Sequence, residues 1–249
     1  MNDYFWKVVP LCEKQLRDVN QKDILNNGLY RKCNIYKGGG GYDKFEDIYK
    51  KRNNLNQEER FNNQFVVQLF GCPLRCPYCY VTNEGIFGNY KEVSTTQLMN
   101  DFYKSKLYVF HLMGGAPALY IEHWIEILEK LPENIPFHSD LLCIEKEYDI
   151  NILKELAKFK NSLYAVSIKG STNEEFKNNT GKDLNKEMFW ENIEKINESK
   201  LPVYFTFTGM NDSSMNHFKK ELKEKFPTDY ENLLKDSFDI KLVKYKALE

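Results

Sequence analysis

Residues 64–82 read QFVVQLFGCPLRCPYCYVT, an apolar run that passes directly into a loop with three cysteines. The run at 65–70 has the length and composition of a buried strand. Cys72, Cys76 and Cys79 follow it with C-x3-C-x2-C spacing. In barrels and in open α/β sheets, ligands bind at the carboxyl ends of the strands. The sequence therefore predicts a buried strand that delivers three thiols to a ligand-binding edge.

The same strand pattern recurs along the rest of the chain and alternates with amphipathic stretches. Five more strands are expected at 107–113, 137–143, 163–169, 203–208 and 238–243. Helices are expected between them at 95–103, 122–131, 149–159, 186–199 and 213–226. Parallel strands joined by crossover helices form either a doubly wound sheet or an incomplete barrel. Periodicity does not separate these two folds.

Residues 1–60 break this rhythm. They hold several polar runs and a tetraglycine at 38–41, which no Gly-Lys-Ser/Thr follows, so a phosphate loop is not indicated. We expect residues 1–60 to form an N-terminal extension or cap with little sheet of its own. Residues 61–249 are expected to form the main domain.

Composition narrows the classes of function. Of 249 residues, 42% are hydrophobic and 29% are charged, which excludes a disordered chain or a coiled coil. Lys and Arg number 35 against 36 Asp and Glu, so no overall charge favours nucleic acid. Every apolar run is shorter than the roughly 20 residues that cross a bilayer. We expect a cytoplasmic protein without a membrane partner, and in a reducing compartment clustered cysteines indicate a metal.

The number of clustered thiols matters for the kind of metal site. A closed structural zinc site or a fully protein-ligated iron–sulfur cluster needs four protein ligands, and this loop offers three. One coordination position would then stay open. Cys143, Cys12 or Cys33 could supply a fourth ligand, and the protein would then be a non-enzymatic zinc or iron–sulfur binding module.

The cysteine run, with Tyr78 directly before its last cysteine and a βα repeat after it, resembles the radical S-adenosylmethionine (radical SAM) superfamily over about 64–245. The resemblance implies an α/β fold, an incomplete (β/α)6 TIM-like barrel with an N-terminal extension. It implies that Cys72, Cys76 and Cys79 hold a [4Fe-4S] cluster whose fourth iron binds S-adenosylmethionine, with Tyr78 near the adenine. It also implies reductive cleavage to a 5'-deoxyadenosyl radical, with flavodoxin or ferredoxin as the reducing partner. Iron–sulfur clusters reach potentials near about -700 mV, low enough for this chemistry.

Residues 111–117, HLMGGAP, are similar to the Gly-Gly-Glu-Pro motif of that family. The resemblance implies that Gly114 and Gly115 bring backbone close to the methionine part of the cofactor. Ala116 stands where the family has a glutamate for the cofactor ammonium group. This loses a charged hydrogen bond of about 1.5–3 kcal/mol. Either backbone carbonyls hold the ammonium group alone, or the cofactor is held differently and another sulfonium bond breaks.

Two later strands end with polar residues on one face. Alternation places Ser167 with Lys169, and Thr206 with Thr208. If helices cover the apolar face, these polar side chains point inward, and the resemblance implies contacts with the ribose or carboxylate of the cofactor. A solvated strand end would explain the first pair equally simply, and strand propensity would explain the threonines.

The third strand carries His138 and Asp140 on one face. They could form a polar pair toward the substrate or an acid/base couple, or they could be structural residues with satisfied hydrogen bonds. His111 is the other histidine of the barrel. The substrate class stays open among small molecules, peptides, RNA and proteins. Residues 71–79 with Lys169-Gly170 and Thr180-Gly181 are similar to glycyl-radical-enzyme activases, whereas Tyr80-Val81 and Ser167 depart from that group.

Overall fold

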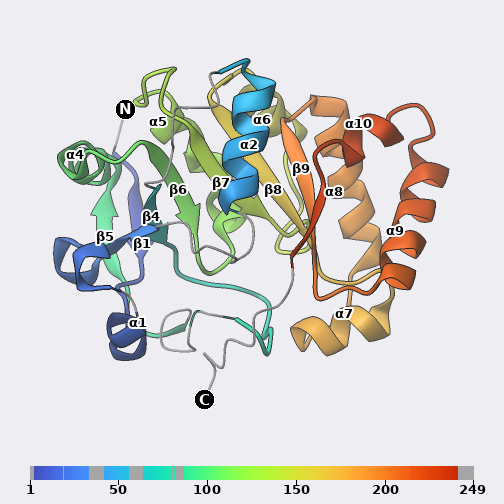
Figure 1. Ribbon diagram of the computed structural model, residues 1–249, viewed down its shortest axis with the longest axis horizontal. Coiled ribbons are helices and arrows are strands. Elements are labelled where there is room, and N and C mark those ends of the chain that lie inside the picture. The colour runs from blue at the N-terminus through green and yellow to red at the C-terminus, as the bar shows by residue number, and fades with distance from the viewer. Residues whose placement is uncertain are drawn as a thin grey trace.

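An eight-stranded sheet forms the centre of the computed structural model, which describes residues 3–18, 20–33, 42–55, 64–79, 81 and 87–240 (Figure 1). Within these residues the strand order is β10-β9-β8-β7-β6-β4-β3-β2. The strands are β2 (Ile24–Leu25), β3 (Tyr30–Cys33), β4 (Gln64–Gln68), β6 (Val109–Met113), β7 (Phe137–Leu141), β8 (Ser162–Ile168), β9 (Val203–Thr208) and β10 (Phe238–Ile240). β4 and β6 to β10 run parallel, while β3 and β2 add an antiparallel edge.

The six predicted strands are therefore confirmed as the six parallel strands. The edge strands β2 and β10 do not pair with each other, so the sheet stays open and the predicted incomplete barrel is confirmed. The last strand was predicted to reach residue 243, and residues 241–243 lie outside the described part of the chain.

Helices follow most of the strands. Those that match predicted segments are α4 (Thr95–Ser105), α5 (Trp124–Leu128), α6 (Ile150–Leu156), α8 (Lys186–Ser199) and α9 (Asp212–Lys225). Several begin at a side chain that accepts a backbone N–H, as Ser94 does from Gln97. Other helices were not predicted: α1 (Glu13–Asp18), α2 (Tyr42–Arg52), α7 (Asn173–Thr180), α10 (Tyr230–Leu234) and the 3-10 helices η1 (Gln21–Asp23), η2 (Asn26–Gly28) and η3 (Pro117–His123).

The prediction that residues 1–60 hold little sheet is wrong. β3 pairs with β4 and β2 pairs with β3, so this part of the chain extends the central sheet. β1 (Phe5–Val8) pairs with β5 (Lys91–Ser94) in a separate two-stranded sheet. These strands are only two to four residues long, too short for a clear period in the sequence. The division of the chain near residue 60 stays a prediction.

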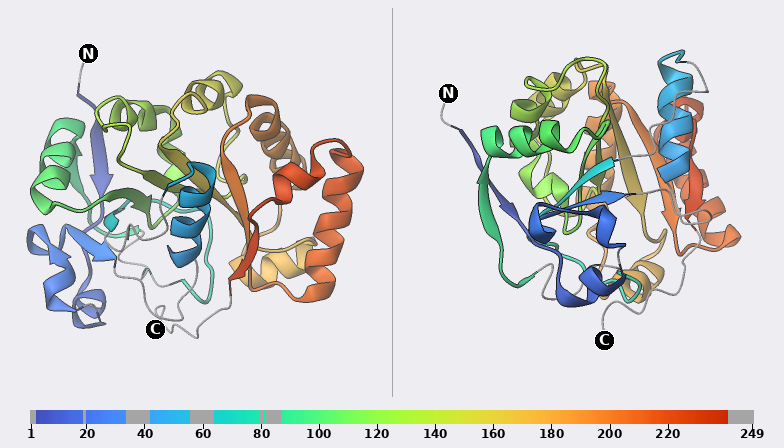
Figure 2. Two further views of the ribbon diagram at one scale, coloured as in Figure 1. Left: turned by 45° about the horizontal axis from the view of Figure 1, so that its top comes forward. Right: turned by 60° about the vertical axis from the view of Figure 1, so that its left-hand side comes forward.

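The two faces of the sheet are covered differently. The outer face packs large apolar side chains such as Phe110, Tyr164 and Phe205 against the crossover helices. The inner face packs Val109, Leu163, Ala165 and Tyr204 against Phe45, Ile48 and Tyr49 of α2. Figures 1 and 2 show α2 across the sheet from α4 and α5. A helix from the N-terminal part of the chain therefore fills part of the lumen.

The position of α2 along the strands follows from its contacts. At its carboxyl end, Arg52 donates to the carbonyl of Val203, at the start of β9, over 2.9 Å and to Asp236 over 3.1 Å. Toward the amino end of α2, the Phe45 ring lies 4.2 Å from the ring of His138, the second residue of β7. α2 thus lies against the amino-terminal part of the inner face, whereas Ser167, near the carboxyl end of β8, is only half-buried. No helix among the described residues is long and apolar enough to span a membrane.

Candidate metal centre

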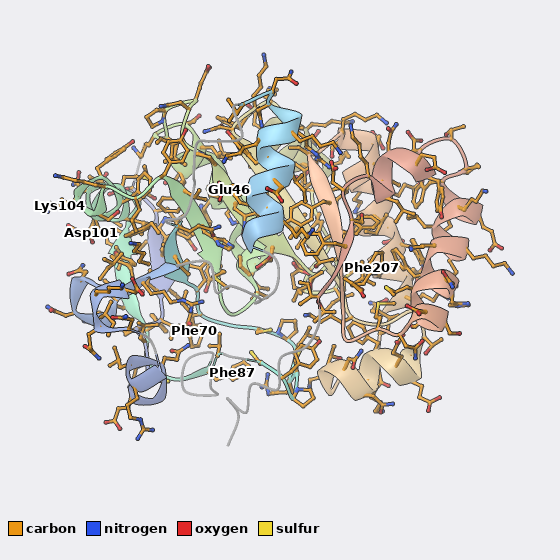
Figure 3. The ribbon with its side chains drawn as sticks, in the orientation of Figure 1. Glu46, Phe70, Phe87, Asp101, Lys104 and Phe207 are labelled. Carbon is orange, nitrogen blue, oxygen red and sulfur yellow. The ribbon has the colours of Figure 1, made fainter. Side chains whose placement is uncertain are left out.

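The cysteine loop leaves the carboxyl end of β4 and is fixed by its own backbone. The chain turns at Gly71, whose φ is +93°, a value that favours glycine. The N–H of Arg75 donates to the carbonyl of Thr180 over 2.7 Å, and that of Cys79 to Cys76 over 3.0 Å. The Arg75 guanidinium lies 3.7 Å from the centre of the Phe87 ring, which Figure 3 labels. Contacts within the protein therefore help to fix the loop.

Two of the three thiols of this loop, those of Cys72 and Cys79, are costly to ionise. Cys76 is buried, and Cys72 and Cys79 are half-buried. Burial, together with the neighbouring Cys76 and Cys79, raises the pKa of Cys72 to about 12, although a backbone hydrogen bond at Leu74 and the positive charge of Lys169 oppose this. Burial also raises the pKa of Cys79, again against Lys169. Because a metal binds thiolates, loading this loop must release protons.

The spacing of the thiols distinguishes one ion from a cluster. Among the described residues, only His111, His138 and Asp140 form a group of three His, Cys, Asp or Glu side chains whose ligand atoms all lie within 4.8 Å of one another. The three loop thiols are therefore spread more widely. Two sulfurs on one zinc ion lie at most about 4.6 Å apart, since Zn–S is about 2.3 Å. Soft donors at a wider spacing fit an iron–sulfur cluster, in which each thiolate takes its own iron.

Cys143 does not supply a fourth ligand in this structure. It packs in the outer core, on the other face of the sheet from α2, and its N–H donates to the hydroxyl of Tyr148 over 3.1 Å. Cys12 directly precedes α1, and the side chain of Cys33 lies outside the described part of the structure. The donor set around the loop is thus three thiols, which leaves one position of a cluster for another ligand.

The Gly-Gly-Ala segment packs directly on the cysteine loop. A Cβ atom on Gly115, whose φ is +61°, would lie 2.4 Å from the carbonyl oxygen of Leu69 and 2.5 Å from that of Gly71. The N–H of Ala116 donates to the Gly71 carbonyl over 2.7 Å. The Ala116 side chain is fully buried in a small cluster that includes Cys76. Packing of the chain against itself is therefore one reason for glycine here. Contact of Gly114, Gly115 and Ala116 with a cofactor stays a prediction.

Replacing Gly115 with alanine should lower the free energy of unfolding by at least about 2 kcal/mol, because the new methyl group meets two backbone oxygens at a strained φ. Iron uptake should fall too, because the displaced oxygens belong to the strand exit that carries the thiols. Urea unfolding and iron content measure the two effects. Gly88→Ala is the control, because Gly88 is exposed and has no positive φ. Equal stability of the two variants would contradict the packing described above.

The structure brings one other predicted residue, Lys169, close to Tyr78 of the loop. The Lys169 Nζ lies 5.5 Å from the centre of the Tyr78 ring, and its charge acts on the loop thiols. The Tyr78 hydroxyl is buried beside Cys76, and burial raises its pKa. Ser167 pairs across strands with Thr206, and the buried Thr208 Oγ1 has no hydrogen-bond partner among the described residues. The cofactor-binding roles of all five residues stay predictions.

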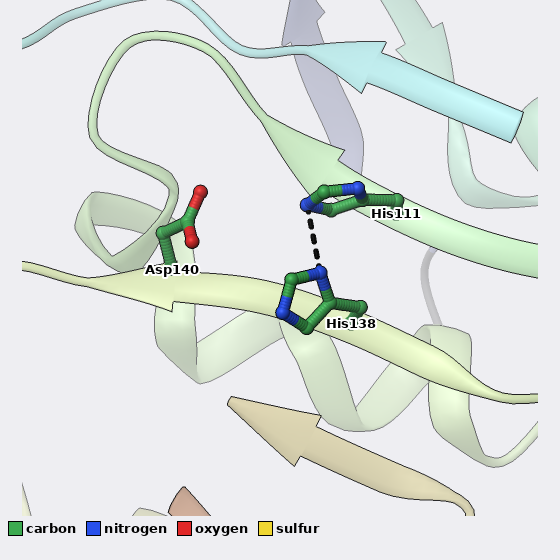
Figure 4. A group of neighbouring side chains, drawn as sticks. All are labelled: His111, His138 and Asp140. Carbon is green, nitrogen blue, oxygen red and sulfur yellow. Dashed lines mark hydrogen bonds between the residues drawn. The ribbon is translucent and has the colours of Figure 1, made fainter. Parts of the chain in front are cut away.

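A polar chain lies deeper on the inner face of the sheet. The Nε2 of His111 and the Nδ1 of His138 are 3.0 Å apart, and Figure 4 marks this contact with a dashed line. The other nitrogen of His111 lies 2.7 Å from Gln64 Oε1, and that of His138 lies 2.9 Å from the Tyr204 hydroxyl. Burial raises the pKa of Asp140 to about 6, and Lys169 opposes this. The sequence analysis missed Tyr204, although it shares an inward face with Thr206.

Comparison with known proteins now places the chain in a family. The model of the radical SAM superfamily matches residues 66–224, more than half of the chain. The chain therefore belongs to the radical SAM superfamily, an enzyme superfamily. No curated protein matches the sequence. Membership confirms the predicted family and confirms its cofactors, S-adenosylmethionine and a [4Fe-4S] cluster, as those of the family to which the chain belongs.

Solved structures with a similar fold include "Streptococcus suis SuiB bound to precursor peptide SuiA", at 16% identity and a TM-score of 0.51, covering 82% of this chain and 46% of that one. Another is "Native anSMEcpe with bound AdoMet", at 18% identity and a TM-score of 0.48, covering 68% and 49%. HydG, "a maturase of the [FeFe]-hydrogenase", has 13% identity and a TM-score of 0.45, covering 76% and 46%. The chain spans about half the length of these proteins.

Proposed function

We propose that the chain holds a [4Fe-4S] cluster on Cys72, Cys76 and Cys79, and that it cleaves S-adenosylmethionine reductively to a 5'-deoxyadenosyl radical that abstracts hydrogen from a substrate. The observation that carries the proposal is the donor set: three thiols of one loop, spread too widely for one ion, with Cys143 on the opposite face of the sheet. When bound, the cluster would supply a low-potential electron to break a sulfonium carbon–sulfur bond.

The surrounding side chains would bind and orient S-adenosylmethionine. The ammonium group of Lys169, beside the thiols, is placed to pair with the cofactor carboxylate. The Tyr78 ring is placed to contact the adenine, and the unpartnered Thr208 hydroxyl is placed to meet a ribose oxygen. Because Ala116 offers no charge, backbone carbonyls beside Gly115 would hold the cofactor ammonium group.

The substrate would lie on the inner face between the cysteine loop and α2. α2 packs against the amino-terminal part of this face through Phe45, so we propose entry from the carboxyl edge. The N-terminal helix α2 would then exclude water at the amino-terminal side of the inner face, and would not cover the entrance at the carboxyl edge. Ser167 and Asp140 make this part of the inner face polar. The substrate, whether small molecule, peptide, RNA or protein, would be one that these groups can hydrogen bond.

The test is anaerobic reconstitution with iron and sulfide, followed by reduction in the presence of S-adenosylmethionine. We expect about four irons per chain and formation of methionine and 5'-deoxyadenosine that requires the reductant. Dithionite can replace the proposed protein donor, a flavodoxin or ferredoxin. An aminocarboxypropyl product would show that another sulfonium bond breaks, and bound zinc without cleavage would refute the proposal. The same preparation without reductant is the control.

A further inference from the structure

We propose that His111, His138 and Asp140 form a second site, for a single divalent first-row transition-metal ion, on the inner face of the sheet. The ligand atoms of these three side chains all lie within 4.8 Å of one another. Figure 4 shows the two imidazole rings and the carboxylate converging from neighbouring strands. Two histidines and one carboxylate suit ions such as Fe²⁺, Co²⁺ and Zn²⁺.

The distance between the two nitrogens fits neighbouring positions on one ion. His111 Nε2 and His138 Nδ1 are 3.0 Å apart. Two ligands at about 2.1 Å from an ion and at right angles to each other are separated by about 3.0 Å. In the absence of an ion, a proton lies between these two nitrogens in a hydrogen bond, and a bound ion would replace this proton. Together with a carboxylate oxygen of Asp140, these nitrogens give three ligands on one side of the ion.

The outer nitrogens of both rings already have partners. His111 Nδ1 lies 2.7 Å from Gln64 Oε1, and His138 Nε2 lies 2.9 Å from the Tyr204 hydroxyl. Histidines that bind metals usually hydrogen bond through the second ring nitrogen, which fixes the orientation of the ring. Gln64 and Tyr204 are thus positioned to orient both ligands.

The backbone holds the ligands on adjacent strands. His111 of β6 and His138 of β7 are direct partners in the parallel register, and Asp140 follows two residues along the same face. Phe45 of α2 packs on the His138 ring and closes one side of the group. Lys169 lies on the other side, where its charge acts on Asp140, so the ion would compete with this ammonium group for the carboxylate.

Three protein ligands leave coordination positions for water or for a ligand. An ion here would lie on the same inner face that the proposed substrate occupies. We infer that it would bind an oxygen or nitrogen atom of the substrate and orient it, without undergoing oxidation or reduction itself. The site does not depend on the cysteine loop, so it can be tested separately from the proposed function.

The test uses the full-length chain with Cys72, Cys76 and Cys79 replaced by alanine, so that no cluster can form. After equilibrium dialysis against Co²⁺, elemental analysis should find about one bound ion per chain. The near-ultraviolet spectrum should lack sulfur-to-metal charge transfer, which excludes Cys12, Cys33 and Cys143 as ligands. If the triple variant does not fold, the number of bound Co²⁺ ions per chain is measured on the unsubstituted chain with its cluster.

Variants decide which side chains hold the ion. Asp140→Asn and His138→Gln should each weaken Co²⁺ binding more than about tenfold. His217→Gln, a control on the exposed surface of α9, should leave it unchanged. The proposal would be overturned if the triple cysteine variant did not bind Co²⁺, or if Asp140→Asn left Co²⁺ binding unchanged. The two histidines would then be a hydrogen-bonded structural pair. Asp140→Asn suffices if His138→Gln does not fold, because Asp140 is less buried.

Discussion

Replacing Cys76 with alanine is expected to lower bound iron after reconstitution from about four to below one per chain, and to bring S-adenosylmethionine cleavage below detection. The reason is that a cluster with two protein thiolates loses a corner, and the Cys143 thiol lies in the outer core, on the other face of the sheet from α2. Iron and sulfide analysis, the brown colour of the product and 5'-deoxyadenosine formation measure the effect.

Cys12→Ala is the control for this experiment, because it removes a thiol that lies next to α1 and not in the cysteine loop. It should retain full iron content and cleavage. If Cys76→Ala still bound about four irons, another residue would have to be a ligand. The open coordination position, and with it the proposed reaction, would then be lost.

Much of the fold could be predicted because its strands are continuous apolar runs. Every residue of β4, β6 and β9 is buried. This is expected because both faces of a parallel sheet are covered. α2 escaped prediction although Phe45, Ile48 and Tyr49 have helical spacing, because polar residues surround them. One of these, Lys50, is buried and paired with Glu46 over 2.7 Å. From sequence alone, the charge of Lys50 predicts an exposed position, because its pairing with Glu46 is visible only in the structure.

The candidate site divides in the same way. Cys72, Cys76 and Cys79 lie within one short loop, so their spacing alone indicated a metal. The approach of Lys169 to Tyr78 depends on how the segment after β8 lies relative to the loop after β4. A local sequence pattern does not predict that arrangement. The chain from Gln64 through the two histidines to Tyr204 spans four strands and depends on register, which the sequence does not specify.

The Lys169→Met variant is expected to bind S-adenosylmethionine about 10- to 100-fold more weakly. Loss of a charged hydrogen bond to the cofactor carboxylate costs about 1.5–3 kcal/mol. The methyl end of methionine keeps the length of the side chain and removes the charge. Calorimetric titration of the oxidised, reconstituted protein with S-adenosylmethionine measures the affinity without turnover, because cleavage requires an electron from the reduced cluster.

A second measurement separates a direct role of this charge from a loss of folding. In the chain without iron, Lys169 lowers the pKa of Cys72 and Cys79, so its removal should leave fewer thiolates and slow their alkylation. Lys225→Met is the matched control, because Lys225 also lies over an aromatic ring, Trp190 at 5.4 Å, far from the thiols. Lys169→Arg should restore most of both effects. If affinity and alkylation were both unchanged in Lys169→Met, Lys169 would be no more than a solvated strand end, and the cofactor carboxylate would need another partner.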